Sequence, residues 1–435
     1  EALTYSYRGE DDDTGGDSLL PGQIVVVPLG RRVVPGVVVK KVAQPDFKTK
    51  AISKVLYSKP LPRHLLKTVQ FMHEYYLVPS GQALSVVLPR GVQKQRRKGK
   101  TEQMFGCSLG GACLQAPARP EITEQFPCGR EIRLNEAQKK ALEALQKAPG
   151  ATKLLHGVTG SGKTNIYVKM ALNALERHFS TILLVPEIAL TGQLVRVFEE
   201  YFGDKVVLIH SQQTEAERHL IFEKVLNAEE PLVVVGPRSA LFAPVSRLGL
   251  IIIDEAHEGT YFQENAPKYS AIRVASFMAR AAGASLVLGS ATPTVEDYYI
   301  ASRQGAVVSI TEKAKASAVK PEIRIIDFKD RGMFSRNRYF SNPLLQATKS
   351  NLDQGRQTLI FHNRRGSAPL TICEDCGEEI LCPNCFLPLN LHADEYVLHC
   401  HTCGYSIKVP VSCPKCGAPG LVHKGFGTKL LETEL

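Results

Sequence analysis

From Arg133 to residue 310 the chain alternates short, uninterrupted runs of valine, isoleucine and leucine with stretches in which apolar residues recur at helical spacing. Uninterrupted apolar runs are typical of strands buried on both faces, as in a parallel sheet. Strands that alternate with helices predict an α/β fold with a doubly wound parallel sheet. The first helix is predicted over Glu136–Ala148, with Asn135 as its N-cap. The predicted strands contain Leu154–Leu155, Thr181–Val185, Val206–Ile209, Leu232–Val235, Leu250–Ile253 and Ser285–Leu288.

Residues 1–92 have a different pattern and predict a smaller, β-rich domain. Gln23–Val27 and Arg32–Val39 are β-branched runs that the intervening residues can join as a hairpin. Leu65–Leu77 follows with helical spacing. Residues 93–132 begin with a basic run and continue with Gly- and Pro-rich sequence, so we expect a linker there.

The overall charge favours an acidic partner. The 435 residues include 53 Lys and Arg against 43 Asp and Glu, a formal charge of +10. This balance suits nucleic acid better than a membrane surface. No apolar run approaches the roughly 18 residues of a membrane-spanning helix, and the N-terminus lacks the layout of a signal peptide. We therefore expect a cytoplasmic protein with no membrane partner and, from its length, two to four domains.

The stretch Gly157–Thr164 reads Gly-Val-Thr-Gly-Ser-Gly-Lys-Thr and matches the phosphate-binding loop pattern at every fixed position. It lies between a predicted strand and the predicted helix Asn165–Leu175, where backbone N–H groups and the helix N-terminus can hold a polyphosphate. We expect Lys163 to contact the β- and γ-phosphates and Thr164 to hold Mg²⁺. The residues expected to line the nucleotide site are Gly157, Thr159, Gly160, Ser161, Gly162, Lys163 and Thr164.

A second motif, Asp254-Glu-Ala-His257, follows the apolar run 250–253 directly. Ligands of open α/β sheets bind at the carboxyl ends of such strands. We therefore expect Asp254 to hold Mg²⁺ and Glu255 to orient and deprotonate the attacking water, with His257 completing the catalytic group. Together with the phosphate loop, this motif predicts an enzyme that hydrolyses a nucleoside triphosphate, and its four residues resemble the box of superfamily 2 helicases.

Polar residues also follow other predicted strands, on the edge that carries the phosphate loop. Four such signals on one edge predict a binding surface, and the Ser-Ala-Thr segment is expected to couple nucleotide state to a second ligand. The four segments are Pro186-Glu187, His210-Ser211, Gly236–Ser239 and Gly289–Pro293.

An aromatic, polar loop follows the acidic box and contains Tyr261 and Phe262, with Tyr269 soon after. One interpretation is that these rings stack on the bases of a single strand, which contributes about 1 to 3 kcal/mol per base. The other is that Tyr261 and Phe262 pack the loop against the sheet. The sequence leaves both open.

Eight cysteines form four Cys-x-x-Cys pairs, the most specific local signal in the chain. They supply two closed tetrahedral zinc sites with no ligand left over, which predicts structural zinc. The inner pairs are separated by fourteen residues, close to the spacing of a zinc ribbon, so we expect them to share one zinc and the outer pairs the other. The outer site comprises Cys373, Cys376, Cys413 and Cys416, and the inner site comprises Cys382, Cys385, Cys400 and Cys403. The remaining cysteines, expected to be free thiols, are Cys107, Cys113 and Cys128.

Taken together, these motifs resemble the PriA family of bacterial primosomal helicases, also called primosomal protein N-prime. The resemblance runs over nearly the whole chain. Besides the four cysteine pairs, the segments that carry it are Arg133–Gln138, Gly157–Thr164, Val185–Ile188, Arg238–Phe242, Asp254–His257, Gly289–Pro293, Asn363–Gly366 and Gly425–Thr428.

The resemblance implies a division of the chain into regions. Residues 133–310 resemble a RecA-like first helicase lobe that binds ATP, and 311–372 the start of a second lobe, with a strand near Thr358–Phe361. Residues 373–416 resemble a two-zinc module inserted in that lobe, and 417–435 its incomplete continuation. Residues 1–92 resemble a domain that captures the 3′ end of a nascent strand, whereas 93–132 are too few for the family's winged-helix domain.

The family's implied function is ATP-driven 3′-to-5′ unwinding of DNA at stalled forks and restart of replication by primosome assembly. The implied partners are forked and single-stranded DNA, single-strand-binding protein and primosome proteins, including the loader of the replicative helicase. A monomer associated with the bacterial nucleoid is expected. Gln138 is expected to contact adenine, and Arg238 with the aromatic loop to contact DNA.

Several positions depart from the family pattern. An acidic residue expected in the first strand is replaced within Tyr5–Tyr7, Ala256 stands where the family often has Glu, and Ile272–Arg273 where an Arg-Asp pair is common. The chain ends at Leu435, before the motifs that bring arginines to the γ-phosphate, each of which contributes about 10³ to 10⁵ in rate in related enzymes. We therefore expect a truncated chain that binds ATP and hydrolyses it poorly. The alternative function is a DNA-binding or scaffolding module with little hydrolysis.

Overall fold

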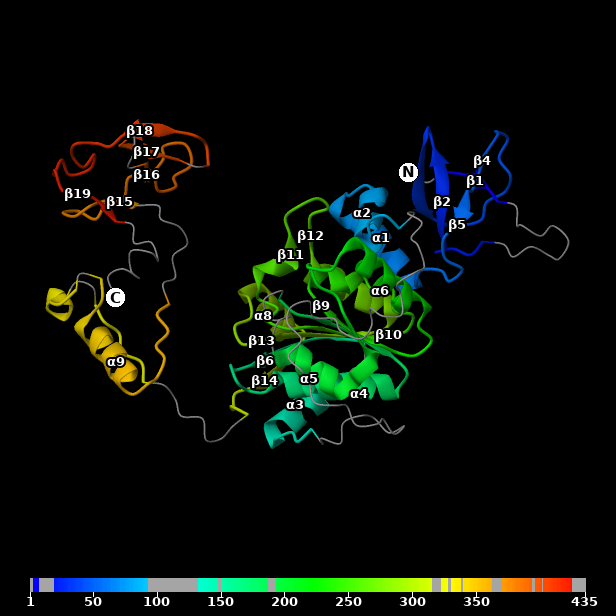
Figure 1. The fold of residues 1–435 in the computed structure, drawn as a ribbon, viewed down its shortest axis with the longest axis horizontal. Coiled ribbons are helices and arrows are strands. Elements are labelled where there is room, and N and C mark those ends of the chain that lie inside the picture. The colour runs from blue at the N-terminus through cyan, green and yellow to red at the C-terminus, as the bar shows by residue number, and fades with distance from the viewer. Residues whose placement is uncertain are drawn as a thin grey trace. The chain divides into compact units, whose positions relative to one another are not determined.

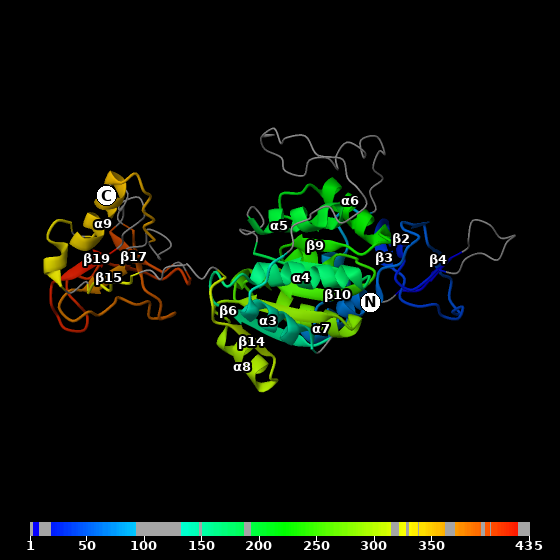
Figure 2. The same cartoon turned by 90° about the horizontal axis from the view of Figure 1, so that it is seen from below.

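The computed structural model describes residues 3–7, 19–92, 132–147, 150–186, 193–314, 322–327, 330–337, 339–361, 370–392, 396–400 and 402–424. The chain forms two compact units, residues 1–319 and 320–435, whose elements Figures 1 and 2 show in two views. The basic run 93–100, Glu187, Asn363–Gly366, Gly425–Thr428 and the three cysteines outside the pairs lie outside the described residues.

A seven-stranded parallel sheet forms the centre of the first unit, which confirms the predicted fold class. The strand order is β14-β6-β13-β10-β7-β9-β8. Each of the six predicted runs overlaps a strand and extends past it by at most one residue, and β14, which the apolar pattern did not indicate, pairs with β6 at one edge. The strands are β6 Thr152–Gly157, β7 Ser180–Leu184, β8 Val206–Leu208, β9 Val233–Gly236, β10 Leu248–Ile253, β13 Ser285–Ser290 and β14 Val307–Ile310.

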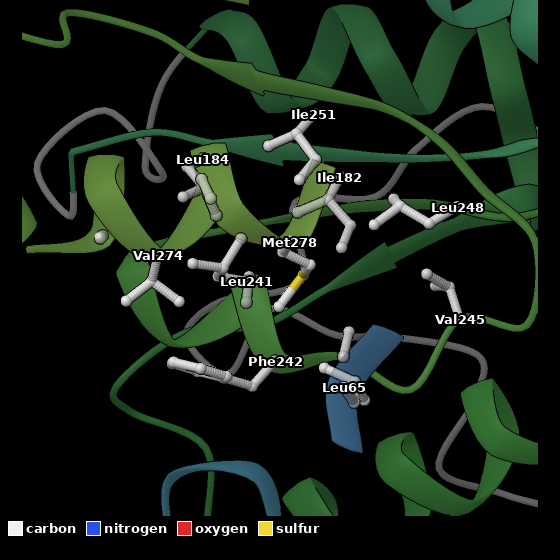
Figure 3. Packing of buried hydrophobic residues seen from close by; sticks show 14 of the residues in the cluster. Leu65, Ile182, Leu184, Leu241, Phe242, Val245, Leu248, Ile251, Val274 and Met278 are labelled. Carbon is white, nitrogen blue, oxygen red and sulfur yellow. The ribbon is translucent and has the colours of Figure 1, made fainter. Parts of the chain in front are cut away.

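Alternate residues of each strand face opposite sides of the sheet, and helices cover both sides. Leu250 and Ile252 pack against α3, α4 and α5, whereas Ile251 and Ile253 belong to the cluster formed with α6, α7 and η4. Figure 3 shows part of this second cluster. The helices of this region are α3 Glu136–Gln146, α4 Lys163–Glu176, α5 Gln193–Phe202, α6 Glu215–Asn227, α7 Ala271–Ala282 and α8 Val295–Arg303; the 3-10 turns are η3 Gly203–Lys205, η4 Arg238–Phe242 and η5 Gly259–Tyr261.

The N-terminal residues form the predicted hairpin and helix and then pack against the parallel-sheet region. Rings of Phe71 and Phe277 stack at 4.2 Å between α1 and α7, and the hydroxyl of Tyr76 accepts a hydrogen bond from the backbone N–H of Ser270. In Figure 3, Leu65 of α1 lies among residues of the sheet and η4. The elements are β1 Tyr5–Ser6, β2 Ile24–Leu29, β3 Arg32–Val37, β4 Lys50–Ala51, β5 Lys54–Val55, α1 Arg63–Tyr76 and α2 Ser80–Val87.

The second unit contains one α-helix among its described residues and an antiparallel sheet in the order β18-β17-β16-β15-β19. Its elements are η6 Arg331–Phe334, α9 Asn342–Asp353, β15 Leu370–Cys373, β16 Asn390–His392, β17 Val397–His399, β18 Ser406–Lys408 and β19 Leu421–Lys424.

The prediction of a strand near Thr358–Phe361 is wrong for this structure. The segment is irregular, and Leu359 and Phe361 are 91% and 79% exposed. A strand needs a neighbour that satisfies its backbone N–H and C=O groups. In the described part of this unit, the sheet is built instead by the strands around the cysteines, and residues 358–361 pair with none of them.

Across the described ranges, no helix combines the length and the apolar character that crossing a bilayer requires.

Candidate nucleotide site and metal centres

The phosphate loop connects β6 to α4 at the carboxyl edge of the parallel sheet. Gly160 and Gly162 have φ angles of +77° and +75°, a left-handed conformation that glycine adopts without steric cost. A Cβ on Gly162 would lie 2.4 Å from Nε2 of Gln138. Lys163 begins α4, is 8% exposed and donates from Nζ to the carbonyl of Gly157 at 3.2 Å. The side chain of Lys163 therefore folds over the phosphate loop and hydrogen-bonds to its first residue.

The other predicted residues of the loop differ in exposure. Thr159 is exposed, whereas Thr164 is half-buried in the first turn of α4. Ser161 is buried, and among the described residues its Oγ has no hydrogen-bond partner. A Cβ on Gly157 would lie 2.6 Å from that oxygen, which requires glycine there. The unpaired hydroxyl fits a loop that receives a phosphate oxygen.

Gln138 is joined to the phosphate loop through its side chain. It is the third residue of α3 and completes a capping box in which its Oε1 accepts from the N–H of Asn135 at 3.0 Å. Its Nε2 donates to the carbonyl of Ser161 at 2.8 Å, and the residue is buried. Contact with adenine stays a prediction, since both ends of this side chain bond within the protein.

The acidic box follows β10 and faces the phosphate loop. Lys163 Nζ lies 3.8 Å from Oε1 of Glu255. Burial raises the pKa of Asp254, an effect that a hydrogen bond from Tyr167 opposes. The backbone carbonyl of Asp254 accepts a hydrogen bond from the hydroxyl of Tyr261 at 2.7 Å. The two carboxylates therefore differ in environment: the half-buried Asp254 is held by the hydrogen bond from Tyr167, whereas Glu255 has an accessible carboxylate beside the lysine.

His257 connects the acidic box to the Ser-Ala-Thr segment. Its Nδ1 lies 2.8 Å from Oγ of Ser290 and 3.5 Å from Oε2 of Glu255. Ser290 Oγ also accepts from the backbone N–H of Thr292 at 3.0 Å. One serine hydroxyl thus bridges β13 and the turn after β10. Coupling of nucleotide state to a second ligand through this segment stays a prediction.

Arg238, which follows the end of β9, forms hydrogen bonds to the backbone of the aromatic loop. Its Nη1 donates to the carbonyl oxygens of Thr260 and Phe262 at 2.8 and 3.1 Å. The guanidinium is exposed beyond these contacts, so the described geometry leaves it accessible to a phosphate. Its place at the carboxyl edge of the sheet, after β9, is the one predicted.

Two of the three aromatic residues proposed to contact DNA are buried. Tyr261 and Tyr269 are 2% and 1% exposed, and the ring of Tyr269 packs edge-on against Phe242 at 5.7 Å. The prediction that bases stack on these two rings is therefore wrong for this structure. Protein covers both rings, and they pack the loop against the lobe. Phe262 is 50% exposed and keeps a ring accessible to a base.

The eight paired cysteines form two separate groups with the predicted membership. In each group the four sulfur atoms all lie within 4.8 Å of one another. The groups are Cys373, Cys376, Cys413 and Cys416, and Cys382, Cys385, Cys400 and Cys403.

The spacing of the sulfur atoms fits zinc. Cys373 and Cys416 lie 3.6 Å apart, and Cys382 and Cys403 lie 3.5 Å apart, too far for a disulfide. A tetrahedron with Zn–S bonds of about 2.3 Å has edges of about 3.8 Å. The backbone N–H of Tyr405 lowers the pKa of Cys403 to about 6, and a hydrogen bond with Cys403 raises that of Cys385 to about 12.

Tyr167 is the residue of this region that sequence reasoning missed, together with the part that Gly289 plays in making room for it. Tyr167 donates from its hydroxyl to Oδ1 of Asp254 at 2.9 Å, and a Cβ on Gly289 would lie 1.7 Å from the same hydroxyl oxygen. One signal was available: Tyr167 follows Thr164 by three residues, and residues three apart share a face of a helix.

The arrangement supplies the parts of phosphoryl transfer to water. Lys163 and the loop N–H groups offer positive charge to phosphate oxygens, and the oxygens of Asp254 and Thr164 are of the kind that Mg²⁺ prefers. Glu255 lies beside them with an accessible carboxylate. These residues come together from β6, α4 and β10, as expected for ligands at the carboxyl edge of an α/β sheet.

Three family models match the chain. They are a DEAD/DEAH box helicase model over residues 135–299, a PriA 3′DNA-binding domain over 2–89, and the Cys-rich region of the PriA DNA helicase over 382–408. Among solved structures, RecG bound to a three-way DNA junction aligns at 22% identity with 51% of this chain and 28% of its own. Its TM-score of 0.36 is too low to support an argument.

Curated relatives named replication restart protein PriA match most of the chain. The Treponema pallidum protein is 31% identical over 99% of this chain, the Chlamydia pneumoniae protein 34% over 94%, and the Bacillus subtilis protein 36% over 73%. The matched segments cover 62%, 56% and 40% of those relatives, so the chain spans only part of their length. The chain belongs to the PriA family of replication restart proteins.

Proposed function

We propose that the protein is an ATP-dependent 3′-to-5′ DNA helicase of superfamily 2, which recognises stalled or forked DNA and restarts replication through primosome assembly. The observation that carries the proposal is the position of Lys163, whose Nζ lies 3.8 Å from Oε1 of Glu255, beside the half-buried Asp254. The match of residues 2–89 to a PriA 3′DNA-binding domain supports DNA as the second ligand. Family membership supports a bacterial cytoplasmic setting at the nucleoid.

In this proposal each residue of the site has one task. Lys163 and the loop hold the β- and γ-phosphates, and Asp254 and Thr164 hold Mg²⁺, which supplies charge that balances the transferred phosphoryl group. Glu255 orients the water and accepts its proton. Because His257 lies between Glu255 and Ser290, a change in the Ser-Ala-Thr segment can alter the position of the base.

The regions have separate tasks. Residues 1–92 bind the 3′ end of DNA, residues 133–310 form the ATP-binding lobe, and Arg238 with Phe262 contacts the single strand. The two Cys₄ sites hold structural zinc because closed tetrahedral shells leave no open position for a substrate. Single-strand-binding protein and the primosome proteins, including the replicative helicase loader, are the proposed partners of a monomer.

The test is ATP hydrolysis by this chain with and without forked DNA. Lys163→Ala removes the phosphate contact, and Lys169→Ala, the same change two turns further along α4, is the matched control. DNA-stimulated hydrolysis that survives Lys169→Ala and is lost in Lys163→Ala supports the proposal. If wild type binds ATP but hydrolyses it no faster than Lys163→Ala, the result supports the DNA-binding or scaffolding function instead.

Direction is tested separately on partial duplexes. A 3′-to-5′ helicase loads on a single-stranded 3′ tail, so we expect strand release from a duplex with that tail and none from its 5′-tailed counterpart. Equal release from both, or release only from the 5′ tail, would rule out the proposed polarity and leave the assignment of ATP hydrolysis intact.

A further inference from the structure

A buried tyrosine on the phosphate-loop helix touches the carboxylate expected to hold Mg²⁺. Tyr167 lies one turn beyond Lys163 and Thr164 on α4, so its side chain points to the same face. Its hydroxyl donates to Oδ1 of Asp254 at 2.9 Å. The contact joins the helix after the phosphate loop to the end of β10, two elements whose motifs are distant in sequence.

The hydroxyl remains a donor under all working conditions. Tyr167 is 0% exposed, and burial followed by the charge of Asp254 raises its pKa well above the ordinary value. A buried hydroxyl without a partner is costly, and the carboxylate of Asp254 removes that cost. The same hydrogen bond opposes the rise in the pKa of Asp254 that burial causes.

A third element, β13, also meets the Tyr167 hydroxyl, and its Gly289 has no side chain to fill that space. A Cβ on Gly289 would lie 1.7 Å from the hydroxyl oxygen of Tyr167 and 2.9 Å from its Cζ. Gly289 has no left-handed backbone angle that demands glycine, so space is the reason for the missing side chain. Its carbonyl also accepts from the N–H of Ala256 at 2.9 Å, which fixes the turn that carries the acidic box.

We propose that Tyr167 is a positioning residue for metal binding: its hydroxyl fixes the rotation of the Asp254 carboxylate, and Gly289 is the space that permits this contact. A carboxylate offers about four lone-pair directions. The hydroxyl occupies one of them on Oδ1, so the remaining ones are presented to a cation in a single orientation. This inference rests on the proposed function, in which Asp254 holds Mg²⁺.

The test measures metal binding, not turnover. Mn²⁺ is titrated into the protein with saturating ADP, and free Mn²⁺ is followed by its electron paramagnetic resonance signal. Loss of a residue that orients a metal ligand weakens affinity by about 10- to 100-fold, which is the expectation for Tyr167→Phe. Tyr269→Phe, which removes another buried tyrosine hydroxyl in the same lobe, is expected to bind Mn²⁺ as the wild type does.

Binding of ADP without metal separates positioning from general loosening of the fold. The phosphate loop and Lys163 lie outside the contact between Tyr167 and Asp254, so we expect Tyr167→Phe to bind metal-free ADP as the wild type does. Metal-free ADP binding that weakens by the same factor as Mn²⁺ binding would indicate a loosened fold and overturn the inference. Wild-type Mn²⁺ affinity in Tyr167→Phe would overturn it as well.

A second variant perturbs the same contact from the other side. Gly289→Ala pushes a methyl group into the hydroxyl, so we expect it to weaken Mn²⁺ binding strongly in the wild type and much less in the Tyr167→Phe background. If Gly289→Ala lowers Mn²⁺ affinity by the same factor in both backgrounds, the inference is contradicted, whatever the thermal stability of the variants. If the wild type itself binds no Mn²⁺ with ADP, the proposed function fails, whereas an unaffected Tyr167→Phe beside a competent wild type refutes only the role of Tyr167.

Discussion

Lowering the pH should destabilise the first unit through one buried histidine on α1. His64 is 6% exposed, and within the described part of the chain its Nε2 has no hydrogen-bond partner. Burial lowers its pKa from 6.5 to about 4, because a charged imidazolium would lose its hydration without gaining a partner. The folded protein therefore keeps His64 neutral in a pH range where the unfolded chain protonates it.

The sign and size of the effect follow from linkage. Between pH 6.5 and 4 the unfolded state binds more protons at His64 than the folded state, so stability falls as the pH falls through this window. With pKa values of 6.5 and about 4, the free energy of unfolding drops by about 2 kcal/mol between pH 7.5 and pH 5. Above pH 7 the histidine contributes almost nothing to this dependence.

The measurement is urea unfolding followed by circular dichroism at several pH values, since the chain has no tryptophan. His64→Leu removes the titrating group, so the free energy of unfolding of the wild type minus that of the variant should fall by about 2 kcal/mol from pH 7.5 to 5. His178→Asn is the control: it removes an exposed histidine whose φ of 58° asparagine tolerates. Parallel pH profiles for wild type and His64→Leu would refute the reasoning.

Three further predictions concern the site and its supports. Ser290→Ala removes the hydroxyl between His257 and Thr292 and should reduce DNA stimulation of hydrolysis about 3- to 10-fold, as expected for one neutral hydrogen bond, without lowering basal hydrolysis; equal loss of both rates would contradict the link. Cys382→Ser should lower bound zinc from two ions per chain to one by metal analysis, while Cys107→Ser keeps both. Lys153 donates to the carbonyls of Ala144 and Leu145 at the end of α3, so Lys153→Met should destabilise the protein by about 1 to 3 kcal/mol in urea unfolding; an unchanged midpoint would show that the lysine's desolvation cancels these bonds.

The parallel sheet and the phosphate loop were predictable because their signals are local. A strand buried on both faces must be apolar at every position, so runs such as Leu250–Ile253 identify it directly. The phosphate loop before Lys163 needs glycines at fixed positions, and the sequence has a glycine at each of them. The two cysteine groups were predictable for the same reason, because the spacing of the Cys-x-x-Cys pairs alone separates the inner site, which contains Cys382, from the outer site, which contains Cys373.

Side-chain partners across the sheet were not predictable in the same way. Tyr261 lies in a polar loop, and nothing near it in sequence shows that its hydroxyl reaches the carbonyl of Asp254. In the sequence, Gly289 is only the residue before the Ser-Ala-Thr segment. In the structure it makes room for the hydroxyl of Tyr167, which is distant in sequence. The segment Thr358–Phe361 fails in the opposite sense: its local pattern favours a strand, and none of the strands in the described part of the chain pairs with it.

The N-terminal region shows where these limits matter for function. Its helix α1 carries Phe71, which stacks on Phe277 of α7, and Tyr76, which bonds to the N–H of Ser270 at the start of that helix. Ser270 pairs with Phe262 where the short strands β11 (Phe262–Gln263) and β12 (Tyr269–Ser270) meet, and Arg238 donates to the carbonyl of Phe262. A chain of contacts therefore connects the region that matches a 3′DNA-binding domain to the aromatic loop beside the acidic box. Because the contacts of α1 with α7 and Ser270 join residues about two hundred positions apart, only the folded structure could reveal this connection.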